Sequence, residues 1–76
     1  MTNTELRNKA ITWLENQNRA CKTRPYKFTP KEITDEIGGV HTLLGRIQKE
    51  VIEELKARGV EIHYSKIGNK RYFELL

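Results

Sequence analysis

The feature that most constrains the fold is a short, strongly capped segment near the middle of the chain. Thr29 stands at a helix N-cap position, Pro30 falls at the first helical position, and Glu32 completes an S/T-x-x-E capping box. Gly38 follows, and a glycine can adopt the left-handed geometry that ends a helix. The segment therefore predicts a helix at 30–37. A helix this short is unstable alone in water, so the rest of the chain must pack around it.

Two longer amphipathic stretches accompany this short helix. Apolar residues recur in them every three or four positions, which predicts helices near 3–21 and 42–58. Gly59 ends the second stretch. Gly45 lies inside it and costs about 1 kcal/mol relative to alanine, so either a neighbouring helix or a ligand approaches closely there, or the cost is tolerated. The predicted core consists of Trp13, Ile33, Ile37, Ile47, Val51, Leu55 and Ile62.

Alternation of apolar and charged residues predicts the strands. Residues 26–28 alternate in this way and indicate a strand that is too short to stand without a partner. Two further alternating runs, near 60–65 and 71–76, flank Gly68-Asn69 and predict a β-hairpin. This hairpin is the one candidate partner for the short strand, and the fold class is α+β.

Composition excludes several classes of protein. The chain forms one small domain, residues 1–76, with a formal net charge of +4, which favours polyanionic partners. No apolar run approaches the ~20 residues of a membrane span, and the N-terminus lacks the apolar stretch of a signal peptide, so we expect a cytoplasmic protein without membrane contact. Cys21, His41 and His63 lack the spacing of metal motifs, so we expect no metal or other cofactor. No catalytic constellation stands out, so we expect no enzyme activity.

The order of helix, short strand, short helix, tight turn, longer helix and hairpin resembles the winged helix-turn-helix family. The segment FTPKEITDEIGGVHTLLGRI, residues 28–47, resembles the family's strand-to-helix-turn-helix region, with Ile33, Ile37 and Val40 at its usual apolar positions. The segment VIEELKARGVEIHYSKIGNKRYFEL, residues 51–75, resembles its stretch from helix end into the wing. The resemblance covers nearly the whole chain and implies three helices, a short strand and a C-terminal β-hairpin wing.

This resemblance implies sequence-specific binding to double-stranded DNA by a small transcriptional regulator. The third helix would enter the major groove, and the hairpin wing would lie on the neighbouring backbone or minor groove. Arginine can pair with a guanine edge through two hydrogen bonds, and lysine can reach a base or a phosphate. The expected DNA-binding residues are His41, Thr42, Gly45, Arg46, Lys49, Lys66, Asn69, Lys70 and Arg71.

Alternatives to this interpretation stay open. The charged face of the third helix could simply be solvated, because Glu50 and Glu53 near Arg46 and Lys49 oppose the approach of phosphate. Winged helices also serve as protein-interaction adaptors, which the acidic run EITDE would suit. A nucleic-acid accessory factor for recombination, packaging or RNA binding would use the same surface. A homodimer would form through the first helix or an exposed strand edge, since readers of this kind commonly gain specificity as dimers.

Overall fold

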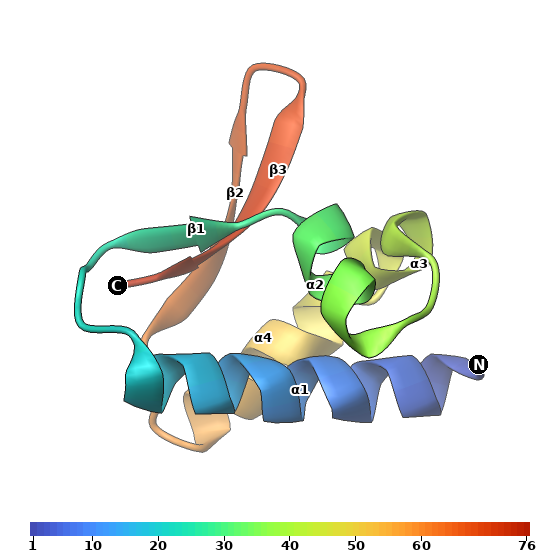
Figure 1. The fold of residues 1–76 in the computed structure, drawn as a ribbon, viewed down its shortest axis with the longest axis horizontal. Helices are drawn as coiled ribbons and strands as arrows, with labels where there is room; N and C mark the ends of the chain where they lie inside the picture. The colour runs from blue at the N-terminus through green and yellow to red at the C-terminus, as the bar shows by residue number, and fades with distance from the viewer.

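The computed structural model describes residues 1–76 and contains four α-helices and one three-stranded antiparallel sheet. The helices are α1 (Asn3–Ala20), α2 (Pro30–Ile37), α3 (His41–Arg46) and α4 (Gln48–Ala57). The strands are β1 (Tyr26–Phe28), β2 (Ile62–Ile67) and β3 (Lys70–Leu75). In Figure 1, α2 and α3 lie together on the side of the chain's N-terminus, and the β2–β3 hairpin extends away from the helices. The predicted α+β class is therefore confirmed.

None of these helices is both long enough and apolar enough to cross a membrane.

The sheet has β3 at its centre, in the order β1-β3-β2. β1 pairs with the last part of β3, where Phe28 lies opposite Phe73, so the predicted partner of the short strand is confirmed. β2 pairs with β3 over its whole length, out to Ile67 opposite Lys70. Gly68 has φ +62° at the first turn position, as a type II′ hairpin turn requires. The half of the hairpin nearest the turn therefore projects as two strands without a third (Figure 1).

The core is one cluster of 15 buried hydrophobic residues to which every helix and strand contributes. α1 supplies a full stripe whose members are at most 1% exposed: Leu6, Ala10, Ile11 and Leu14. Five residues of the predicted core lie in the cluster: Ile33, Ile47, Val51, Leu55 and Ile62. Trp13 and Ile37 are half-buried and pack against it, so Trp13 lies at the edge of the core, with its ring edge-on to Phe28 at 4.9 Å. The sheet contributes more than the sequence suggested, through Phe28, Phe73 and Leu75.

The prediction of one continuous helix near 42–58, and so of three helices, is wrong, because the chain leaves helical geometry at Ile47. This residue has φ −98° and ψ 10° and separates α3 from α4. Hydrogen bonds still bridge the break, from Ile47 N to Leu43 O at 3.1 Å and from Val51 N to Ile47 O at 3.3 Å. We attribute the break to the low helix propensity of Gly45 just before it and to the burial of the Ile47 side chain, which is 7% exposed. The hairpin strands begin and end within two residues of their predicted bounds.

The turn between α2 and α3 sets the position of α3. The Thr29 hydroxyl oxygen accepts the Glu32 backbone N–H at 3.1 Å and caps α2 as predicted. At the other end, Gly38 and Gly39 have φ +88° and +94°, a region that other residues rarely adopt. A Cβ on Gly39 would lie 2.9 Å from Leu6 Cδ1, so this turn also packs directly on α1. Both glycines are therefore required, the second for packing as well as for its backbone.

Ile47→Ala should lower the free energy of unfolding by about 2–5 kcal/mol, because the change empties a buried volume at the junction of α3 and α4. Urea unfolding followed by circular dichroism measures this loss. Glu53→Ala, at an exposed position of α4, is the control and should change stability by less than about 0.5 kcal/mol. Equal small effects from both substitutions would mean that Ile47 is not part of the core.

Candidate nucleic-acid interface

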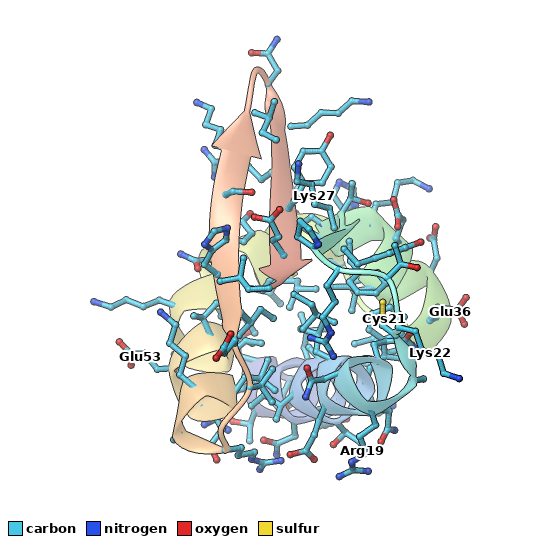
Figure 2. All side chains as sticks on the ribbon, turned by 90° about the vertical axis from the view of Figure 1, so that its left-hand side faces the viewer. Arg19, Cys21, Lys22, Lys27, Glu36 and Glu53 are labelled. Atoms are coloured by element: carbon cyan, nitrogen blue, oxygen red, sulfur yellow. The ribbon has the colours of Figure 1, made fainter.

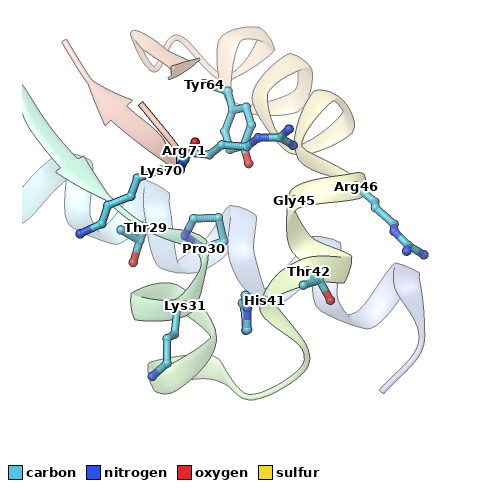
Figure 3. A pocket seen from close by; sticks show the side chains of 11 residues that line it. Thr29, Pro30, Lys31, His41, Thr42, Gly45, Arg46, Tyr64, Lys70 and Arg71 are labelled. Atoms are coloured by element: carbon cyan, nitrogen blue, oxygen red, sulfur yellow. The ribbon is translucent and has the colours of Figure 1, made fainter. Parts of the chain in front are cut away.

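A concave surface lies between α3, the start of α2 and the β2–β3 hairpin, and it encloses about 650 Å³. We call it the α3–hairpin groove. Figure 3 shows side chains from all three elements around it. Its eleven lining residues are Thr29, Pro30, Lys31, His41, Thr42, Gly45, Arg46, Tyr64, Asn69, Lys70 and Arg71.

The groove brings together most of the residues that the sequence singled out. Seven of the nine line it: His41, Thr42, Gly45, Arg46, Asn69, Lys70 and Arg71. Lys49 and Lys66 do not line it, although both are exposed. The break at Ile47 places Lys49 on α4, whereas Arg46 ends α3, so the two cations belong to different helices.

The groove is positively charged. Lys31, Arg46, Lys70 and Arg71 line it, and no carboxylate does. Of these four cations only Lys31 has an ion-pair partner, Asp35 at 3.4 Å on the next turn of α2. Arg46, Lys70 and Arg71 therefore keep their full charge available to a ligand.

Carboxylates are paired on other faces of the molecule. Arg58 contacts Glu54 at 3.1 Å and Glu15 at 3.5 Å, which joins α4 to α1. Glu74 contacts Lys27 at 3.8 Å on the sheet face opposite to the core. These pairs engage three of the ten acidic side chains, all of them outside the groove.

The two acidic residues that argued against phosphate contact lie outside the groove. Glu50 and Glu53 both belong to α4, and neither lines the concave surface. Figure 2 shows Glu53 projecting outward from α4, away from the hairpin. Neither carboxylate is therefore among the side chains that a ligand in the groove would contact.

Four of the lining residues were not expected from the sequence: Thr29, Pro30, Lys31 and Tyr64. Tyr64 could have been found from the hairpin register. The Gly68-Asn69 turn places Lys66 opposite Arg71 and Tyr64 opposite Phe73, so Tyr64 shares a sheet face with these cations. For the start of α2 no such local signal exists, because only the tertiary packing brings it beside the hairpin.

Gly45 is approached by the hairpin. A Cβ built on Gly45 would lie 3.4 Å from the Tyr64 hydroxyl oxygen, which is ordinary van der Waals contact. The Tyr64 ring is fixed by Phe73, with ring centroids 4.9 Å apart in an edge-on arrangement. The sequence left open whether a neighbouring element approaches Gly45 closely. One does, and it is strand β2, through Tyr64, rather than another helix.

The three residues considered as metal ligands in the sequence do not come together in a metal-binding cluster. His41 lines the groove, His63 contacts Glu74, and the Cys21 thiol lies 3.2 Å from the Thr23 carbonyl oxygen. No group of three or more histidine, cysteine, aspartate or glutamate side chains is placed to hold a metal ion.

Comparisons of the chain with protein-family models, with curated proteins and with solved structures gave no match.

The hairpin carries two like charges face to face, and their repulsion can be measured. Lys66 and Arg71 are directly opposite and exposed, and neither has an ion-pair partner. Opposed like charges destabilise a sheet, whereas opposite charges contribute about 0.2–1 kcal/mol. Lys66→Glu should therefore raise the free energy of unfolding by about that amount in urea titrations at low salt. Lys66→Ala, which only removes the repulsion, should give a smaller gain, and a loss of stability in Lys66→Glu would contradict the opposed register.

Proposed function

We propose that this protein is a winged helix-turn-helix protein that binds double-stranded DNA with sequence preference and acts as a small transcriptional regulator. In this proposal α2 and α3 form the helix-turn-helix, α4 continues the third helix, and the β2–β3 hairpin is the wing. The element order and the strand order β1-β3-β2 support the assignment. Helix-turn-helix proteins place the second of the two helices in the major groove.

The observation that carries the proposal is the α3–hairpin groove, which four cations line and no carboxylate enters. Duplex DNA presents one negative charge for about every 1.7 Å of its axis, so a ligand with closely spaced phosphates matches these cations. Eight of the eleven lining residues come from two separate elements, α3 and the β2–β3 hairpin. This arrangement suits a ligand that presents a groove and an adjoining backbone at the same time.

The proposed roles follow from position. Arg46 in the last turn of α3 is exposed and without an ion pair, and arginine is the side chain that most often pairs with guanine. Thr42 and His41 begin α3 and would contact neighbouring bases or phosphates. Lys70 and Arg71 lie at the hairpin turn, where backbone phosphates are the expected target.

The length of α3 limits what one copy can read. Its six residues span about 9 Å, which covers about three base-pair steps. A homodimer would read two such half-sites and so gain specificity. In this proposal the contact between copies uses α1 or the outer edge of β2, which pairs only with β3.

One observation favours a second candidate, a protein-interaction adaptor. Val40 and Met1 are 57% and 53% exposed beside the turn between α2 and α3. A Cβ on Gly39 would lie 3.3 Å from Met1 Sδ, so this methionine covers the turn itself. An apolar surface at this turn, outside the groove, would suit a protein partner.

Selection from a random duplex pool, followed by titrations at several salt concentrations, separates these candidates. A DNA-binding protein should enrich one sequence family. Its logarithmic affinity should fall with log salt at a slope of about −3 if Lys31, Lys70 and Arg71 each meet a phosphate while Arg46 contacts a base. A parallel titration with duplex RNA tests the nucleic-acid accessory alternative. Failure to bind any nucleic acid at low salt would refute the proposal and leave the adaptor as the leading candidate.

Two alanine substitutions should weaken DNA binding in different ways. Arg46→Ala should cost about 1–3 kcal/mol on the selected sequence and relax the preference at one base pair, because it removes a base contact. Lys70→Ala should weaken all duplexes about equally and reduce the salt slope by about one, because it removes a phosphate contact. Fluorescence anisotropy on the selected duplex and its single-pair variants measures both effects.

The charge-matched control is Lys56→Ala in the last turn of α4, outside the groove. It removes the same charge and should leave affinity and slope nearly unchanged. If Lys56→Ala weakened binding as much as Lys70→Ala, net charge alone would explain the affinity and the assignment of the surface would be wrong.

A further inference from the structure

We propose that Tyr64 is a DNA-phosphate contact whose hydroxyl donates a hydrogen bond to one backbone phosphate at the junction of α3 and the hairpin. This inference rests on the proposed function and names a residue that charge and helix position alone do not select. It also gives Gly45 a role, because the hydroxyl reaches the junction over this residue.

The position of the hydroxyl is well determined by packing. The Tyr64 ring is half-buried and packs edge-on against Phe73, which is fully buried, so a ring that swung away would lose this contact with the core. Figure 3 shows the Tyr64 side chain pointing from β2 toward Gly45, while Arg46 points outward from α3. The 3.4 Å between the hydroxyl oxygen and a Cβ built on Gly45 shows how closely the two elements meet. A longer side chain at Gly45 would stand between the hydroxyl and the groove.

The hydroxyl is available as a donor. The side-chain hydrogen bond of this hairpin joins His63 to Glu74 on the other sheet face, and no protein atom accepts the Tyr64 hydroxyl. Within the groove, no carboxylate is present to accept it. A ligand oxygen in the groove would therefore be its first strong acceptor.

The surroundings favour a phosphate over a base edge as that acceptor. The register places Arg71 diagonally from Tyr64 on the same sheet face, within reach of its long side chain. A phosphate at the junction would then receive one neutral and one charged donor, and hydrogen bonds to a charged acceptor are the stronger kind. Base contacts fall instead to α3, because Arg46 points away from Tyr64 (Figure 3).

The test compares Tyr64→Phe with Tyr72→Phe. Both changes delete one hydroxyl and keep the ring, but Tyr72 lies on the opposite face of the same sheet, where its ring is 6.0 Å from Lys27 Nζ. Tyr64→Phe should weaken binding to every duplex about tenfold, the loss expected for one hydrogen bond to a charged group. Its salt slope should stay unchanged, because a neutral side chain releases no counterion. Tyr72→Phe should bind as the native protein does.

A second measurement locates the phosphate and does not depend on small differences in stability. Single phosphates of the selected duplex are replaced, one at a time, by neutral methylphosphonates. At one position the replacement should weaken the native protein at least tenfold and Tyr64→Phe by a smaller factor, because the variant has already lost one of the two donors to that phosphate. Thermal unfolding of Tyr64→Phe should have a midpoint within about 2 °C of the native value, because the hydroxyl has no protein partner to lose.

The outcomes are distinguishable. If Tyr64→Phe binds duplex DNA as tightly as the native protein while Arg46→Ala and Lys70→Ala bind it more weakly, the Tyr64 inference is wrong and the proposed function stands. A changed preference at one base pair in Tyr64→Phe would show a base contact and overturn the phosphate assignment. If the native protein binds no duplex, the proposed function and this inference fail together.

Discussion

The pairing of β1 with β3 is the constraint on which the α3–hairpin groove depends. Phe28 lies opposite Phe73, and the next residue, Thr29, both caps α2 and lines the groove. The register therefore fixes the start of α2 a few residues from the hairpin turn, where Lys70 and Arg71 lie. The Arg24 side chain adds a second tie between these distant segments by donating to the Leu76 carbonyl oxygen at 3.2 Å. A slip of one residue would turn Phe28 out of the core, so this position is strongly specified.

Positive and negative side chains are unevenly distributed over the surface, which the net charge of the molecule does not show. Carboxylates near the helices are engaged by arginines, as in the contacts of Arg58 with Glu15 and Glu54. Exposed pairs of this kind contribute little stability, about 0–1 kcal/mol each. Their larger consequence is electrostatic, because these carboxylates are engaged away from the groove, whose lining carries four cations and no carboxylate. This separation is what the proposed binding to a polyanion would use.

Local signals in the sequence were sufficient for most of the fold and for part of the candidate site. The cap at Thr29 and the turn at Gly68-Asn69 are each decided by neighbouring residues, and both lie where the sequence predicted. The break at Ile47 was not predictable in this way, because apolar spacing continues through it and only packing reveals it. Tyr64 was not expected in the groove for a related reason. It stands at an apolar position of an alternating strand, and that pattern predicts a core residue. Only the tertiary structure, in which α3 meets the hairpin, shows that its hydroxyl reaches the groove.

The candidate site and the adjoining part of the hairpin contain features that lower stability, and this cost can be compared with the free energy that ligand binding would contribute. Lys66 faces Arg71 across a two-stranded segment that β1 does not reach, and Gly45 weakens α3. Together these features cost about 1–2 kcal/mol relative to a neutral pair and an alanine. A ligand present at a hundred times its dissociation constant stabilises the state that it binds by about 2.7 kcal/mol. Binding of a phosphate backbone across the hairpin would therefore more than offset the cost, and the free protein should be least stable in the region that it uses to bind.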